Sequence, residues 1–503
     1  MRTKYCTILF LLTAIGFSSC NKYLDVKPKG RLIPSDVADF DKLLDNTNIV
    51  QWVFLDNNTG STLGYFTDNL ALSEGIGEVS YKANNHPNID RYYSYLFRAP
   101  FKNPNTSDYF WDWGTYRSMA YFNNVIDGIT GLGDYSKDEY ARQVVAQATV
   151  NRAWSYFITT MVYGPVYKPG GDNSRKTIPY LTSSDMGAPM PMLSTQEEVY
   201  SKVLGDIHNV LADAPTVTSW PSRPNKNAAW ALLAYYHLFT RKFDSVVHYS
   251  NLAWNAASGG NAAKLIYDYN TFFWADPANP VTSELKGPDN LLAQPNNREV
   301  LLFRNTDNGA GRSSSSYPSA EFKALFDQAT DLRYKYFFLT APGYKTTYNG
   351  VTYDDGNQVQ YYRGAKTQMT AGFTWPEVLL MRAEGYARTN EPDKAIADLN
   401  TLRKFRYVTG TPDLATGTQD EVIKLVLEER RRELPLAHFK RFLDLKRYTL
   451  DAGKSWSKTN ITHMVGSQSY EGTIDSDDFI LPISNLILQY NPQWGVPLDT
   501  RAF

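Results

Sequence analysis

Cys20 is the residue whose surroundings most clearly specify a chemical reaction. It follows two basic residues, Arg2 and Lys4, an apolar run over 8–17 and a serine pair at 18–19. This layout is typical of a secretory signal, and the run is shorter than the roughly 20 residues that a membrane-spanning helix needs. A cysteine directly after the small residues suggests a bacterial lipoprotein signal. We therefore predict a signal peptide over 1–19 and lipidation of Cys20; the alternative is an ordinary signal peptide followed by a chance cysteine.

Other reactive constellations are missing from the sequence. The second cysteine, Cys6, lies in the segment to be cleaved, so no disulfide framework is available. The six histidines are dispersed, and no Gly-x-Ser-x-Gly elbow, phosphate-binding glycine loop or dinucleotide fingerprint occurs. The acidic group Asp475, Asp477 and Asp478 is interpreted as a solvated turn rather than a calcium site. We expect no cofactor, no metal and no catalytic residue, although sequence alone does not exclude a carboxylate pair brought together by folding.

Aromatic residues next to polar ones are the better candidates for function. A sugar ring has apolar faces and hydroxyl edges, so a glycan site combines exposed aromatic platforms with amide, carboxylate or guanidinium groups. Three clusters have this composition: Asn84-Asn85 with Arg91, Tyr92, Tyr93 and Tyr95; Phe272-Phe273-Trp274 with Asp276; and Arg312 with Tyr317. Trp274 and Tyr92 are the preferred pair of platforms. The alternative is that each ring fills the underside of its own loop.

The composition limits the classes of partner. The chain has 503 residues, a formal net charge of -1, 35 tyrosines and 11 tryptophans. A near-neutral charge does not fit the basic surface expected of a nucleic-acid-binding protein. Beyond the signal, no apolar stretch approaches membrane-spanning length, so we expect the body of the protein to be tethered rather than inserted.

The remaining pattern is mostly helical. Helices are predicted over 109–130, 138–163 and 195–211, the last with a capping box that uses Ser194 or Thr195. Two segments have the spacing of tetratricopeptide hairpins, with Ala234 and Ala383 as the small residues where helices approach closely. Trp111, Trp113, Trp154 and Trp230 lie on predicted helices and are assigned to packing.

Two long regions, 265–319 and 341–370, break the helical pattern, with one strand-like run at 299–304. Loops this long are usually functional, so we expect the site there. The charge run at 428–433 is interpreted as a helix whose arginines and glutamates pair locally at three- and four-residue spacing.

The order of motifs along the mature chain resembles the SusD/RagB family of surface lipoproteins. The resemblance rests on motifs spread from the N-terminus to the C-terminus: Leu24-Asp25-Val26 with Pro28, Asn123-Asn124, Arg152-Ala153 leading to Tyr163-Gly164-Pro165, Asn227 to Ala234, Glu377 to Glu384, Asp331 with Arg333, Glu429 to Leu434, Asp444 to Arg447, and Leu481-Pro482-Ile483. Two places depart from the pattern: Ala437-His438-Phe439 replaces the usual Glu-Gly, and the C-terminal Gln-Asn-Pro-Gly-Tyr ending is absent.

The resemblance implies a mainly α-helical fold, in which a tetratricopeptide-like scaffold carries long irregular loops and a few short strands. It also implies a single SusD-like domain over 41–503, with an N-terminal part over 41–260 and a C-terminal part over 261–503, preceded by a tether and the start of the fold over 20–40. Such a protein captures a glycan at the cell surface and delivers it to a SusC-like TonB-dependent outer-membrane transporter. Three alternatives stay open: an oligopeptide receptor, a surface hydrolase, or an adaptor that binds only protein.

Overall fold

The computed structural model describes residues 34–51, 62–108, 110–290, 296–305, 316–362, 370–435 and 438–503. Cys20, the predicted signal peptide and Arg312 lie outside the described residues. No helix among the described residues has both the length and the apolar character needed to cross a membrane.

The predicted helices are present, and their ends follow the capping signals. The first predicted helix is divided into η3 (Phe110–Tyr116) and α6 (Arg117–Gly131). The second is α7 (Glu139–Tyr163), whose N-cap Asp138 accepts a hydrogen bond from Ala141 N. The third is α8 (Gln196–Val210), where Thr195 and Glu198 form the capping box. Thr195 is therefore the N-cap, because its extended backbone directs its hydroxyl toward the N–H of Glu198.

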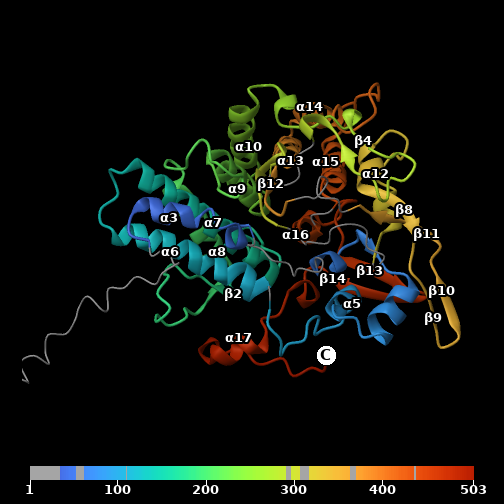
Figure 1. The fold of residues 1–503 in the computed structure, drawn as a ribbon, viewed down its shortest axis with the longest axis horizontal. Coiled ribbons are helices and arrows are strands. Elements are labelled where there is room, and N and C mark those ends of the chain that lie inside the picture. The colour runs from blue at the N-terminus through green and yellow to red at the C-terminus, as the bar shows by residue number, and fades with distance from the viewer. Residues whose placement is uncertain are drawn as a thin grey trace, which may run out of the picture.

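The two predicted hairpins form and pack against each other. The first consists of α9 (Lys226–Phe239) and α10 (Phe243–Ser258), and the second of α13 (Trp375–Arg388) and α14 (Pro392–Arg403). Although the hairpins are distant in sequence, α10 packs on α13 (Figure 1). Ala234 and Ala383 are fully buried, as predicted for positions of close approach.

Gly385, which the sequence reasoning did not single out, marks a close approach of the two hairpins. A Cβ at this position would lie 2.8 Å from Val247 Cγ2 and 3.2 Å from Val247 N on α10. Backbone cannot move aside as a flexible side-chain end can, so a larger residue would push the two helices apart.

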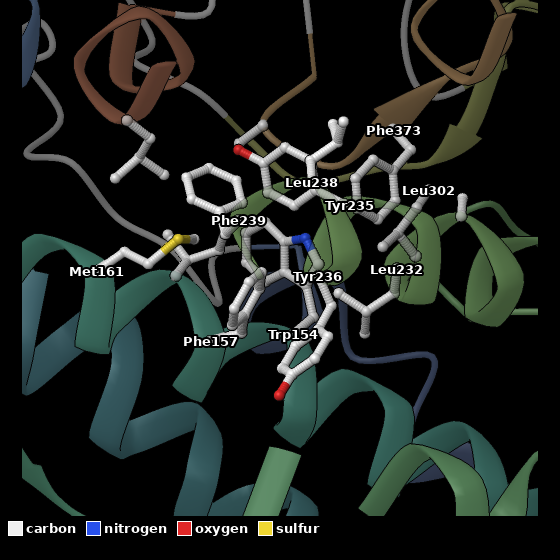
Figure 2. Packing of buried hydrophobic residues seen from close by; sticks show 14 of the residues in the cluster. Trp154, Phe157, Met161, Leu232, Tyr235, Tyr236, Leu238, Phe239, Leu302 and Phe373 are labelled. Carbon is white, nitrogen blue, oxygen red and sulfur yellow. The ribbon is translucent and has the colours of Figure 1, made fainter. Parts of the chain in front are cut away.

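A large apolar core holds these helices together. Figure 2 shows side chains of α7 and α9 meeting at its centre, among them Trp154, Phe157, Tyr235 and Phe239. The ring of Phe157 lies 5.2 Å from that of Tyr236 and 5.8 Å from that of Phe239. Trp111 and Trp154 are buried and Trp230 is half-buried against this core, which confirms their assignment to packing.

We call this region the helical half; it lies at the left and top of Figure 1. Its other helices include α3 (Val37–Leu43), α4 (Thr47–Val50), α15 (Gln419–Glu433) and α16 (His438–Tyr448). The C-terminal segment adds α17 (Asn485–Tyr490).

The described strands are short and form seven antiparallel two-stranded ladders. These are β1 (Leu70–Ala71) with β7 (Tyr317–Pro318), β2 (Lys176–Pro179) with β3 (Leu193–Thr195), β4 (Phe273–Trp274) with β5 (Leu285–Lys286), β6 (Val300–Leu302) with β12 (Phe373–Thr374), β8 (Phe338–Pro342) with β11 (Asn357–Tyr361), β9 (Lys345–Tyr348) with β10 (Val351–Asp354), and β13 (Asn460–Val465) with β14 (Gln468–Thr473). The run at 299–304 thus contains β6, as predicted. A helical scaffold with a few short strands is confirmed.

A second apolar core, which we call the aromatic core, lies beneath the irregular regions. Its buried rings are Tyr65, Tyr81, Tyr92, Tyr95, Tyr267, Tyr269, Phe272, Trp274, Tyr317, Phe322, Phe326, Tyr336, Phe337, Phe338 and Tyr361. They come from η2 (Gly75–Ala83), α5 (Ile89–Tyr95), α11 (Ala320–Lys323), α12 (Leu332–Phe337) and the neighbouring strands and loops. These elements, with β13 and β14, form the aromatic half at the right of Figure 1.

Candidate functional site

All three predicted aromatic clusters contribute to the aromatic core. Tyr92, Trp274 and Tyr317 are 1%, 5% and 6% exposed, so the expectation that they are exposed platforms is wrong. The physical reason is that this region consists mostly of loops and short strands. Its large rings are buried because they supply the apolar contacts that hold these loops together. Whether these residues contact a ligand stays a prediction.

Phe273, by contrast, projects to the surface. It is 56% exposed, whereas its neighbour Trp274 is 5% exposed. The two alternate because successive side chains of a strand point to opposite faces. Trp274 packs edge-on to Tyr362 at 5.0 Å and lies 6.2 Å from Tyr336. The buried indole thus fixes the strand that presents the exposed phenyl ring.

The β4–β5 hairpin that carries Phe273 also carries polar groups. Phe273 pairs in register with Lys286, whose ammonium lies 2.6 Å from the Glu284 carboxylate. In the connecting loop, Asp276 accepts a hydrogen bond of 2.9 Å from Asn279 Nδ2. An exposed ring beside ammonium, carboxylate and amide groups can stack on the apolar face of a sugar and hydrogen-bond its hydroxyls.

The α5 cluster is divided between core and surface. Tyr92 stacks on Tyr81 at 5.8 Å and donates its hydroxyl to Glu78 Oε1 at 2.7 Å. Burial and the Glu78 carboxylate raise the pKa of the Tyr92 phenol well above its usual value. Tyr93 is half-buried beneath the Arg98 guanidinium, which lies 4.0 Å from the ring centre, and Asn84 is exposed at the end of η2.

Tyr317 has a positioning role within the loops. Its hydroxyl donates to Asp355 Oδ2 at 2.7 Å and accepts from Tyr344 N at 2.7 Å. Burial and Asp355 raise the pKa of the Tyr317 phenol. The buried hydroxyl therefore holds the segment 344–355 against β7.

The sequence reasoning did not single out Tyr348, an exposed tyrosine at the tip of the β9–β10 hairpin. Tyr348 is 38% exposed and pairs with Val351 across the two-residue turn Asn349-Gly350. Both turn residues have positive φ, 49° and 80°. An Asn-Gly pair between alternating residues is a strong hairpin signal, and it was available in the sequence.

Phe273, Tyr93 and Tyr348 lie on three separate elements of the described structure: β4, α5 and the β9–β10 hairpin. Figure 1 places β4 at the top of this half, α5 at its lower end, and the β9–β10 hairpin at the outer edge. The structure therefore brings the buried members of the three clusters together in one core and separates the exposed ones.

A cavity of about 580 Å³ lies elsewhere, between the C-terminal segment and β2–β3. Phe101 and Tyr163 contribute aromatic surface, and Arg175, Asp477 and Arg501 contribute charges. Its volume is within the range of small-molecule sites, but none of the predicted site residues lines it.

Charged clusters singled out in the sequence are engaged in protein contacts. Asp475 pairs with Lys168 at 2.9 Å, and Asp477 pairs with Arg175 at 2.6 Å. Among the described residues, no group of three histidine, cysteine, aspartate or glutamate side chains is placed to hold a metal ion.

The expectation of local pairing in the run 428–433 is largely wrong. Arg432 does pair with Glu429 one turn away, but Arg430 contacts Glu377 and Asp444, and Arg431 contacts Glu321. Because α15 is buried between neighbouring elements, its arginines face carboxylates from distant parts of the chain.

The comparisons with known proteins agree with this architecture. A family model described as "Starch-binding associating with outer membrane" matches residues 22–238, and the SusD family model matches residues 328–493. No curated protein sequence matches the chain.

Solved structures share the fold. A SusD-like carbohydrate-binding protein from Bacteroides vulgatus is similar, with a TM-score of 0.61 at 16% identity over 91% of this chain and 97% of the other. SusD superfamily proteins from Bacteroides thetaiotaomicron (TM-score 0.62, 18% identity, 91% and 98% covered) and Bacteroides fragilis (0.64, 15%, 92% and 99%) are also similar. At these identities the likeness establishes the fold, and the two family models together span most of the sequence. The chain belongs to the SusD/RagB family.

Proposed function

We propose that this protein is a cell-surface glycan-binding lipoprotein that captures oligosaccharides or polysaccharides without hydrolysing them. Family membership supports carbohydrate binding in association with the outer membrane. The observation that supports particular residues is the exposed ring of Phe273, which pairs with Lys286 on a hairpin that also carries Glu284 and Asp276.

The region around Phe273 also lies outside both ranges that the family models match. The two matched ranges end at 238 and begin at 328, and Phe273 lies between them. A segment outside the shared pattern is a natural place for ligand specificity. Stacking on Phe273 would supply affinity, and the polar neighbours would orient the sugar.

Trp274 supports the Phe273 surface from below, whereas Tyr92 and Tyr317 hold other parts of the aromatic half in place. Tyr93, Asn84 and Tyr348 would be additional contact sites for a long polysaccharide, since they lie at separate places on the aromatic half. Arg312, which is outside the described residues, is retained as a predicted ligand contact.

Delivery completes the proposed mechanism. Lipidation at Cys20 would anchor the protein in the outer membrane, and a SusC-like TonB-dependent transporter would receive the ligand. A tether raises the effective concentration of the captured ligand near its receptor. In this proposal 41–503 acts as one domain whose parts, 41–260 and 261–503, are held by the shared helical core. The comparisons do not favour the oligopeptide alternative.

Calorimetry and affinity electrophoresis of the protein truncated after Cys20 would test this proposal. A panel of polysaccharides and oligopeptides would be compared, with product analysis after long incubation. Saturable glycan binding without cleavage would support it. Binding of peptides alone, or release of shorter sugars, would refute it.

A further inference from the structure

Arg304 is a fully buried arginine whose side-chain hydrogen bonds to the described residues all go to neutral groups. It follows β6 and has no exposed surface. One terminal nitrogen donates to Ser222 O at 3.0 Å and to Phe303 O, and the other donates to Asn151 Oδ1. The guanidinium carbon lies 5.5 Å from the Trp154 ring centre. These partners solvate the guanidinium but do not neutralise its charge.

Other fully buried arginines of this protein contact carboxylates. Arg333 lies 2.7 Å from Asp331, Arg406 lies 2.8 Å from Glu433, and Arg430 lies 2.8 Å from Asp444. Within the described ranges, no carboxylate lies at ion-pair distance from Arg304.

The charge of Arg304 is expensive to bury. An ionised group without a counter-charge loses its hydration with nothing to replace it. Burial lowers the pKa of the Arg304 guanidinium to about 9, so the group is still charged at neutral pH. A bound counter-ion would remove most of this cost.

Two hydrogen-bond donors, one on the guanidinium and one on the amide that contacts it, have no acceptor among the described residues. Arg304 Nε and Asn151 Nδ2 are buried without a hydrogen-bond partner, and both residues are fully buried. Each of these atoms can only donate, so the missing partner must be an acceptor. Both donors belong to the same hydrogen-bonded pair of side chains.

From this geometry we propose that Arg304 and Asn151 hold a small monovalent anion of the halide class, coordinated by Arg304 Nε and Asn151 Nδ2. Complete burial of both residues restricts the ligand to an ion rather than an organic acid. The positive charge and the donors favour an anion over water, which would bring hydrogens of its own.

The site would join two parts of the helical half. Asn151 lies on α7, whereas Arg304 N donates to Thr370 Oγ1 at 2.7 Å and Arg304 O accepts from Ala371 N at 2.9 Å. Residues 370–374 lead directly into α13. A bound anion would therefore stabilise the contact between α7 and the chain entering the second hairpin.

Thermal unfolding in chloride and in gluconate at matched ionic strength tests the proposal. Because an ion bound only by the folded state stabilises it by mass action, Tm should rise with chloride and not with gluconate. Crystals soaked in bromide should show an anomalous peak between Arg304 Nε and Asn151 Nδ2. Equal Tm values in the two salts, or water density at that position without a bromide peak, would overturn the proposal.

Two variants and a control make the test specific. Asn151→Asp places a carboxylate beside the guanidinium, so we expect a higher Tm than wild type at low chloride and loss of the chloride response. Arg304→Met should also lose the response. Arg175→Met removes a half-exposed surface arginine and should leave the response unchanged, which controls for general salt effects. A chloride response in Asn151→Asp equal to that of wild type would refute the assignment, even if Arg304→Met does not fold.

Discussion

The helical half and the aromatic half bury their large side chains by different means. In the helical half, two regular helices, α7 and α9, meet in the core and are buried on nearly all sides, over 144–163 and 231–239. In the aromatic half, rings from short strands and loops far apart in sequence meet in one core. Burial there depends on tertiary contacts rather than on a local period.

Neighbouring residues illustrate the consequence. Phe273 and Trp274 are adjacent, chemically similar and equally suited to stack on a sugar, yet one is exposed and the other is buried. In the aromatic half, the exposure of each single residue therefore decides whether it can contact a ligand. In the helical half, buried ion pairs such as Glu377 with Arg430 help to fix how the elements pack.

The largest effect is expected from breaking such an ion pair in the helical half. Glu377 on α13 is fully buried and contacts Arg430 at 3.0 Å and the buried ammonium of Lys440. Glu377→Ala leaves Lys440 without its carboxylate, and the unpaired charge should lower the free energy of unfolding by about 3–5 kcal/mol. Urea denaturation measures the loss.

A surface pair in the same half provides the control. Glu428 lies 3.8 Å from Lys424, and both are partly exposed. Glu428→Ala should therefore change stability by less than about 1 kcal/mol. Similar losses in the two variants would show that burial does not set the strength of these pairs.

The Phe273 and Trp274 pair gives the next largest effect and tests the aromatic half. Trp274→Ala should lower the free energy of unfolding by about 3 kcal/mol, because it opens a cavity between Tyr336 and Tyr362. Phe273→Ala should leave stability within about 0.5 kcal/mol and weaken glycan binding about tenfold or more. Denaturation and calorimetry of both variants distinguish the two roles. Loss of binding in a fully stable Trp274→Ala, with Phe273→Ala unaffected, would reverse them.

Much of the helical half was predictable because its signals are local. The capping residues Asp138 and Thr195 and the small residues Ala234 and Ala383 each act within one helix or one hairpin. What could not be predicted is which distant carboxylates reach the arginines of α15. Pairs such as Arg430 with Glu377 depend on the packing of α15 against α13, which no local pattern specifies.

In the aromatic half, the composition of the candidate site was predictable but its exposure was not. Phe273 belongs to a cluster identified from the sequence, whereas the preferred residues Trp274 and Tyr92 became core. On a strand only two residues long, alternation gives two faces and does not say which one meets the core. Tyr348 was missed although Asn349-Gly350 marks its hairpin.

A pH experiment tests the buried ammonium group of Lys446 in the helical half, whose hydrogen bonds go to carbonyl oxygens. Lys446 on α16 is buried and donates to Met161 O and Gly164 O, both at 2.8 Å, at the end of α7. Burial lowers the pKa of Lys446 to about 7. The unfolded chain then binds more protons than the folded one above pH 7, so stability should rise with pH by at most about 1.4 kcal/mol per unit.

Lys446→Met isolates the contribution of Lys446 to the pH dependence of stability, because it removes the titrating group and keeps an apolar side chain of similar length. Denaturation of both proteins at several pH values between 7 and 9 gives the difference in slope. If the difference between variant and wild type does not change with pH, the ammonium stays charged and the two carbonyl contacts outweigh its burial.

The smallest effect is expected at Tyr92, a buried residue of α5 in the aromatic half. Tyr92→Phe keeps the ring that stacks on Tyr81 and removes only the hydroxyl that donates to Glu78. Because the net contribution of such a hydrogen bond is modest, unfolding free energy should fall by about 1 kcal/mol and glycan affinity should not change. Denaturation and calorimetry of the same preparation measure both. A loss of affinity at unchanged stability would mean that the Tyr92 hydroxyl reaches the ligand. Tyr92 would then belong to the binding surface of α5 and not only to the core.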